Sequence, residues 1–245
     1  MTRPLIPARR RQEILRAVRA GSTHVGDLAQ TFGVSEMTVR RDLRELAGAG
    51  MVERVRGGAV RAGGEPPFEE SAVERFEAKD RIGAAAAALV EDGQTVMIDI
   101  GTTTLQAARH LHGRRITVVT SSLAVLEELV PDEAVELVLP GGLVRRNYRS
   151  LVGVLAEDSL RQLQADVLFL GASAVDGACA VWDSTMVEVP IKRAMIAAAA
   201  RVVLLADAAK FAGSGSVRVC AADAVDVLVT DAPPPVDADV EVVLA

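Results

Sequence analysis

The chain has 245 residues and a formal net charge of −6, half of its residues are hydrophobic, and it holds two cysteines. No apolar run reaches the roughly 18 residues of a membrane span, and two cysteines without a CxxC pattern suggest neither a disulfide framework nor a zinc site. The basic, polar N-terminus lacks the apolar stretch of a signal peptide, so we expect a cytoplasmic protein and no membrane partner.

The charge is unevenly distributed along the chain. Residues 1–62 hold 12 Arg and no Lys against 6 acidic residues, whereas residues 63–245 hold 15 basic and 27 acidic residues. A basic segment joined to an acidic one indicates a nucleic-acid partner for the first. Charge alone leaves a solvated, arginine-rich surface as an equal alternative.

Residues 1–62 predict three helices followed by a hairpin. Apolar residues at helical spacing mark the first two helices, and Gly33 is expected to end the second. Ser35 is expected to cap the third helix by accepting a hydrogen bond from a free amide. Apolar residues at i, i+4 and i+7 of that helix predict a buried stripe: Val39, Leu43 and Leu46.

The face of the third helix opposite this stripe carries cations and a hydroxyl. A helix, a tight turn and a capped second helix form the helix-turn-helix arrangement, whose second helix enters the DNA major groove. Arginine forks suit phosphate oxygens and guanine, and two short strands around Gly57-Gly58 predict a basic wing. A helical protein-interaction domain is the alternative. The residues expected to contact double-stranded DNA are Ser35, Thr38, Arg40, Arg41, Arg44 and Arg56.

Glycines and prolines in residues 63–80 break both helix and strand, so we expect a linker there, between domains at 1–62 and 81–245. Beyond it, continuous apolar segments alternate with alanine- and leucine-rich helical segments. This pattern predicts an α/β domain with a mostly parallel sheet covered on both faces. The expected strands lie within residues 95–100, 116–120, 135–140, 166–173, 201–207, 226–231 and 240–245, and the expected helices include 105–111, 123–129 and 151–163.

Ligands of such sheets bind beyond the carboxyl ends of the strands. The turn "DIGTTT" places a glycine and three threonines at a helix N-terminus, which suits a phosphate, although a plain helix cap is equally expected. The chain has only 3 Lys among 27 basic residues, and a compact ammonium reaches a phosphate where a guanidinium does not fit. The residues expected to bind a ligand are Asp99, Gly101, Thr102, Thr103, Thr104, Ser122, Glu188, Lys192 and Lys210. No metal or cofactor is expected.

The run "VSEMTVRRDL" with the following "RGGA" resembles the winged helix-turn-helix of the DeoR family of bacterial transcriptional regulators. "DIGTTT", "TSSL", "FLGAS", "EVPIKRAMI" and "ADAAKF" resemble its sugar-phosphate-sensing domain. The resemblance implies a domain similar to ribose-5-phosphate isomerase, in which Gly101 to Thr104 and Lys210 hold the phosphate. Asp99, Glu188 and Lys192 would contact or organise the polyol. Arg56 replaces the family's usual histidine, and Ser121 its usual asparagine.

The resemblance implies a repressor of carbohydrate genes, whose repression is relieved when a phosphorylated sugar binds. Catalysis is one rival, because Glu188 could act as the base of an isomerase. Related isomerases carry carboxylates where this chain has Ala172 to Ala174, so we expect no enzyme. A purely oligomerising domain is the other rival. One recognition helix reads few base pairs, so we expect a homo-oligomer, in which Arg145, Arg146 and Arg149 contact either ligand or a neighbouring subunit.

Overall fold

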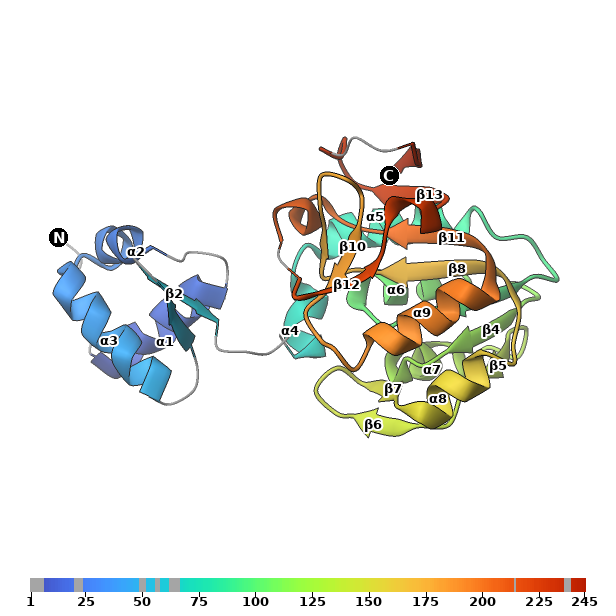
Figure 1. The fold of residues 1–245 in the computed structure, drawn as a ribbon, viewed down its shortest axis with the longest axis horizontal. Coiled ribbons are helices and arrows are strands. Elements are labelled where there is room, and N and C mark those ends of the chain that lie inside the picture. Colours follow the sequence, from blue (N-terminus) through green and yellow to red (C-terminus); the bar gives the residue numbers. More distant parts are fainter. Residues whose placement is uncertain are drawn as a thin grey trace. The chain divides into compact units, whose positions relative to one another are not determined.

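The computed structural model describes residues 7–19, 24–48, 52–55, 58–61, 67–213, 215–235 and 239–245. The chain divides into two compact units, residues 1–65 and 66–245 (Figure 1). The division falls within the predicted linker. Helices α4 (Phe68–Val73) and α5 (Phe76–Ala87) open the second unit.

The first unit has three helices and a hairpin, as the sequence predicts. Gly33 ends the second helix with a φ of 61°, in the left-handed region that glycine adopts without strain. Ser35 caps the third helix, because its Oγ accepts a hydrogen bond from the Thr38 amide at 3.2 Å. The elements are α1 (Pro7–Arg19), α2 (Val25–Phe32), α3 (Glu36–Gly48), β1 (Val52–Val55) and β2 (Gly58–Arg61).

The apolar stripes of these elements meet in one core. The predicted stripe of α3 is buried together with apolar residues of α1, α2 and β1, including Ile14 and Leu28. An ion pair joins α1 to α3 beside this core, where Arg10 Nε lies 2.6 Å from Asp42 Oδ2. The arginine of this pair is buried, so it is not part of a DNA-binding surface.

The hairpin of the first unit differs slightly from the prediction. Val55 of β1 pairs with Gly58, so Gly58 belongs to β2 rather than to the turn. The predicted DNA contact Arg56 and its neighbour Gly57 lie outside the described residues.

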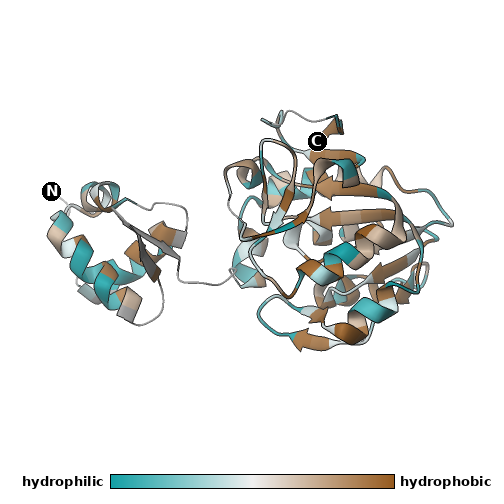
Figure 2. Ribbon diagram, in the orientation of Figure 1, coloured by the Kyte–Doolittle hydropathy of each residue, from teal (hydrophilic) through white to brown (hydrophobic). Residues whose placement is uncertain are grey.

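A seven-stranded, entirely parallel sheet forms the centre of the second unit, in the order β14-β13-β11-β8-β3-β4-β5. All seven predicted strands are confirmed. Figure 2 shows these strands as mostly hydrophobic, as expected for a sheet buried on both faces. Their bounds are β3 (Thr95–Ile98), β4 (Thr117–Thr120), β5 (Glu136–Val138), β8 (Ala165–Gly171), β11 (Ala199–Leu205), β13 (Val227–Thr230) and β14 (Glu241–Leu244).

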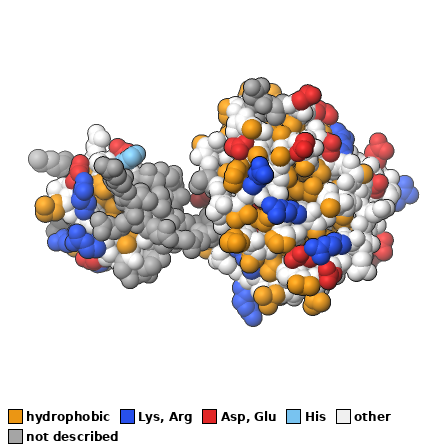
Figure 3. All heavy atoms as spheres, viewed as in Figure 1, with side chains coloured by type: hydrophobic (Ala, Val, Ile, Leu, Met, Phe, Trp, Pro, Cys, Tyr) orange, Lys and Arg blue, Asp and Glu red, His pale blue; other side chains and the backbone are white. Residues whose placement is uncertain are grey.

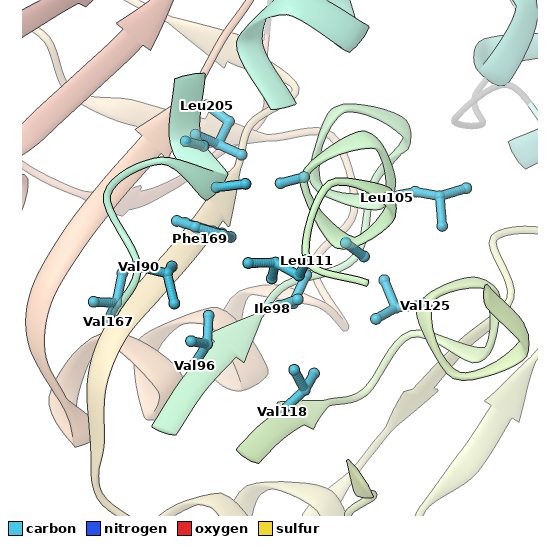
Figure 4. Close-up of a cluster of buried hydrophobic side chains, with 14 of the residues drawn as sticks. Val90, Val96, Ile98, Leu105, Leu111, Val118, Val125, Val167, Phe169 and Leu205 are labelled. Carbon is cyan, nitrogen blue, oxygen red and sulfur yellow. The ribbon is translucent and has the colours of Figure 1, made fainter. Parts of the chain in front are cut away.

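Helices cover both faces of this sheet. Alternate residues of each strand point to opposite sides, and both sets are apolar, so each face packs against helices. Val96 and Ile98 join the core with α5, α6 (Thr102–Arg109) and α7 (Leu123–Leu129), which Figure 4 shows in close-up. Met97, between them, joins the core with α8 (Val154–Leu160) and α9 (Val189–Ala198). No helix in the described part of the chain is long and apolar enough to cross a membrane.

Two small antiparallel elements were not predicted. One is the hairpin of β6 (Leu143–Arg145) and β7 (Ser150–Val152); the other is a sheet of β12 (Val217–Cys220), β10 (Val181–Asp183) and β9 (Ala174–Val175). The predicted helix at 151–163 is wrong at its start, because Leu151 and Val152 lie in β7. Gly153 then takes a φ of 96°. Its left-handed conformation separates the strand from α8.

Candidate functional site

The outward face of α3 carries the predicted DNA contacts. Arg40, Arg41 and Arg44 are exposed, as is Met37 beside them. Arg40 pairs with Glu36 at 3.0 Å, an exposed i, i+4 pair that contributes little to stability and can open. In the described part of the chain, Arg41 and Arg44 form no ion pair with any carboxylate closer than 4.0 Å. The helix therefore presents the capped turn of Ser35 and Thr38 and two guanidinium groups that have no carboxylate partner among the described residues.

The second candidate site lies where the strand order of the large sheet reverses. The chain enters the sheet at β3, adds β4 and β5 on one side, and then places β8 on the other side of β3. Such a reversal opens a crevice between the carboxyl ends of the two central strands. Asp99 follows β3 there, and Gly171 ends β8 beside it.

A buried ion pair lies at the carboxyl ends of these two strands. Lys192, in the second turn of α9, donates a hydrogen bond to the Asp99 carboxylate and another to the Gly171 carbonyl at 3.0 Å. Its Nζ also lies 3.6 Å from Asp183 Oδ2. Burial lowers the pKa of Lys192, but the Asp99 and Asp183 carboxylates outweigh this effect and raise it. The lysine is therefore charged and holds Asp99 in place.

Glu188 lies one turn before Lys192, at the start of α9. Its Oε1 accepts hydrogen bonds from Ser150 Oγ at 2.6 Å and from Arg145. Burial raises the pKa of Glu188, and the hydrogen bonds from Ser150 and Arg145 oppose this rise. The unpredicted β6–β7 hairpin thus supplies two partners to a predicted site residue.

Three oxygen atoms of this site are buried and lack a hydrogen-bond partner among the described residues. They are Asp99 Oδ1, Ser121 Oγ and Glu188 Oε2. Leaving a buried polar atom unpaired costs about 1–3 kcal/mol, more for a charged group. Two carboxylate acceptors and one hydroxyl suit the hydroxyl groups of a small polar ligand.

The "DIGTTT" turn forms the start of α6, as predicted. Gly101 has a φ of 136°, which favours glycine, and Thr104 Oγ1 donates to the Gly101 carbonyl at 3.0 Å. The backbone amides of Thr102, Thr103 and Thr104 donate to no backbone acceptor in the described residues, whereas Leu105 makes the first helical bond. Free amides at a helix N-terminus attract an anion.

Ser122 and Lys210, the remaining predicted ligand contacts, lie after β4 and β11. Ser122 Oγ accepts from the Val125 amide at 3.3 Å and so caps α7, whereas the hydroxyl of the neighbouring Ser121 has no partner among the described residues. Lys210 is half-buried in the short 3-10 helix η1 (Ala208–Ala212).

Sequence reasoning left Lys79 and Ser150 out of this site. The charge of Lys210 lowers the pKa of Lys79 on α5. The sequence feature that could have pointed to Lys79 is the rarity of lysine in this chain. Ser150 had no such signal, because its role depends on the unpredicted hairpin. Two of the arginines that the sequence assigned to either ligand or subunit contacts form ion pairs within the chain. Arg145 pairs with Glu188, and Arg149 pairs with Glu127.

A helix-turn-helix unit with exposed arginines, followed by an α/β unit with a polar site at its switch point, defines a transcriptional regulator with a sensor domain. The family model described as a DeoR-like helix-turn-helix domain matches residues 10–63, and that of the DeoR C terminal sensor domain matches residues 74–232. The chain belongs to the DeoR family of transcriptional regulators. The match confirms the resemblance predicted from the sequence.

Curated relatives match over nearly the whole chain. The HTH-type transcriptional regulator GlpR of Haloferax volcanii is 35% identical over 93% of this chain and 91% of its own length. The glycerol-3-phosphate regulon repressor of Escherichia coli K12 is 33% identical over 88% of this chain and 87% of its own length. The putative aga operon repressor of Escherichia coli O157:H7 is 34% identical, over 96% and 93%. These relatives are regulators rather than enzymes.

Solved structures with a similar fold include ribose 5-phosphate isomerase A of Methanocaldococcus jannaschii. It is 17% identical and covers 56% of this chain and 55% of its own, with a TM-score of 0.43. The translation initiation factor eIF-2B of Pyrococcus horikoshii is 14% identical and covers 91% of this chain and 82% of its own, with a TM-score of 0.45.

Proposed function

We propose that the protein is a cytoplasmic repressor of carbohydrate-metabolism genes, and that a phosphorylated sugar bound in the second unit relieves repression. The observation that carries the proposal is a set of buried oxygens of Asp99, Ser121 and Glu188 at the switch point that have no hydrogen-bond partner among the described residues. The amides at the start of α6, which follows β3, support an anion site there, because those of Thr102 to Thr104 have no backbone acceptor among the described residues. Similarity to a glycerol-3-phosphate regulon repressor supports a phosphate ester of a polyol.

The two parts of such an effector have separate partners. The amides of Thr102, Thr103 and Thr104 suit the phosphate, together with the hydroxyls of Thr102 and Thr103 and the Lys210 ammonium. The Thr104 hydroxyl already donates to the Gly101 carbonyl. The free carboxylate oxygens of Asp99 and Glu188 suit hydroxyl donors of the sugar. Lys192 already binds Asp99 and the Gly171 carbonyl, so its role is to organise the site rather than to touch the effector.

Replacing Thr103 and Lys210 together by alanine is expected to weaken effector binding by at least about tenfold, because charge-assisted hydrogen bonds contribute about 1.5–3 kcal/mol each. Isothermal titration against a panel of phosphorylated sugars measures the effect. DNA affinity should be unchanged, which gives a repressor that ignores its inducer.

The control for this experiment is Arg161→Ala, an exposed cation at the end of α8. This change removes a positive charge without altering a residue of the switch-point site. A wild-type protein that binds no member of a broad panel would contradict the proposal and favour a purely oligomerising second unit.

We further propose that a second copy of the chain docks on an exposed apolar surface of the second unit. This surface consists of large hydrophobic side chains on β6, at the start of α8 and in the loop before α9, and Figure 3 shows such side chains over the region of β6 and α8. Two recognition helices are needed to read a repeated operator, which a dimer supplies. The residues are Leu143, Val144, Val154, Leu155, Met186 and Val187.

Changing Leu143 and Leu155 to glutamate is expected to shift the protein from oligomer to monomer, because an interface of this kind depends on its apolar centre. Leu143 is 73% and Leu155 70% exposed. Sedimentation velocity measures the state. Val130→Glu, at an apolar residue 61% exposed beyond α7, is the matched control. Unchanged association of the double variant would place the interface elsewhere.

A further inference from the structure

The junction between α4 and α5 is held in an unusual conformation. Arg75, between the two helices, has a φ of 53°, a left-handed conformation that a non-glycine residue adopts only when its surroundings impose it. Two carboxylates provide that constraint. Arg75 Nε lies 2.9 Å from Asp207 Oδ1, and its Nη2 donates to Asp231 Oδ2 at 2.6 Å.

The same two carboxylates hold the segment that carries Lys210. Asp207 Oδ1 accepts from the Ala209 amide at 2.9 Å, and Asp231 Oδ1 accepts from the Ala208 amide at 2.7 Å. Both amides belong to η1, the short helix of Lys210. The position of this lysine and the conformation of the α4–α5 junction therefore depend on shared anchors.

Lys79 makes a second connection, one turn after Arg75 on α5. Its Nζ donates to the Ser71 carbonyl at 2.7 Å, in the last turns of α4, where carbonyls lack helical partners. The side chain is buried, and the charged groups around it are Lys210, Asp207, Glu74 and Arg75. Burial, followed by the charge of Lys210, lowers the pKa of Lys79 to about 8. The two lysines therefore repel each other.

We infer that Arg75 and Lys79 are positioning residues that couple occupancy of the effector site to α4, the first helix after the segment that joins the two units. The inference rests on the proposed function, in which Lys210 binds the effector's phosphate. A dianion at Lys210 offsets the repulsion and favours the charged form of Lys79. Its charge-assisted bond to Ser71 then holds α4 more firmly. By reciprocity, releasing α4 weakens the binding of the phosphate.

Hydrogen exchange of the α4 amides in the full-length protein tests this coupling, with glycerol 3-phosphate as the probe and inorganic phosphate as the minimal anion. Saturating probe is expected to slow exchange of residues 69–73 by roughly 5-fold or more in the wild type. In Lys79→Met the probe should still bind through Lys210 and the α6 amides, but α4 exchange should no longer respond. Arg81→Met, on the exposed face of α5, is the matched control and should behave as the wild type.

Proton uptake is a second measurement. Titration at pH 8 in two buffers of different ionisation enthalpy should show that the wild type takes up protons on binding the probe and that Lys79→Met does not. Arg75→Gln keeps Lys79 but should also lose the response of α4. Agreement between the two variants would show that the loss in Lys79→Met is not a folding defect of that variant. Binding with no change in α4, or an equal response in Lys79→Met, would overturn the inference alone. Failure of both probes to bind the wild type would overturn the proposed function and the inference with it.

Discussion

Replacing Lys192 by methionine is expected to lower the free energy of unfolding by about 3–5 kcal/mol, because it strands the buried Asp99 carboxylate without its partner. Lys192 is 2% and Asp99 0% exposed, so water cannot replace the lost ammonium. Methionine keeps most of the volume of the lysine side chain, which separates the loss of charge from the creation of a cavity. Urea denaturation at neutral pH measures the difference.

A double-mutant cycle assigns the loss to the pair. Asp99→Asn together with Lys192→Met removes both charges and should recover part of the stability that either single change loses. Arg201→Met is the comparison at the surface, where Arg201 pairs with Glu241 at 3.5 Å. An exposed pair contributes at most about 1 kcal/mol. A loss below this value in Lys192→Met would show that the buried pair does not support the fold.

The same cycle separates the structural role of the pair from the proposed sensing role. The double variant should fold, yet it lacks the carboxylate oxygen that we assign to a sugar hydroxyl. We therefore expect recovered stability without recovered effector binding. The two oxygens of the Asp99 carboxylate thus have different roles. One accepts hydrogen bonds from Lys192 and the Gly171 amide, and the other has no partner among the described residues.

The sheet could be predicted because parallel strands buried on both faces must be continuously apolar, and each of the seven runs stands between helical segments. In the first unit, local chemistry was sufficient. Gly33 ends α2 and Ser35 caps α3 through contacts within a few residues along the chain. Contacts between residues this close along the chain can be recognised from the sequence alone.

The β6–β7 hairpin could not be predicted for a physical reason. Its strands have three residues each, too few for a period of two to be recognised, and β6 is largely exposed. Leu151 and Val152 fit the apolar pattern of the following helix equally well. The pairing of Lys192 with Asp99 spans 93 residues, so only the fold brings the two together. No spacing rule reveals which buried oxygens are left unpartnered.

Replacing both Arg41 and Arg44 by alanine is expected to weaken operator binding by about 100-fold or more, since an arginine that reads a base or phosphate contributes roughly 1–3 kcal/mol. Neither guanidinium forms an ion pair closer than 4.0 Å with the described residues, so neither has to leave a carboxylate partner before it meets DNA. A fragment selected from genomic DNA by the wild type serves as operator, and fluorescence anisotropy measures binding over a range of salt concentrations.

The salt dependence distinguishes the two roles of an arginine. Each lost phosphate contact should reduce the slope of log K against log salt by about 0.9, whereas a lost base contact lowers affinity for the operator more than for random DNA. Arg16→Ala on α1, 77% exposed at its side chain, is the matched control and should change neither quantity. If the double variant bound operator as the wild type does, the exposed arginines of α3 would not be the DNA-reading face. The helix-turn-helix unit would then contact DNA through another surface, with the wing as the next region to test.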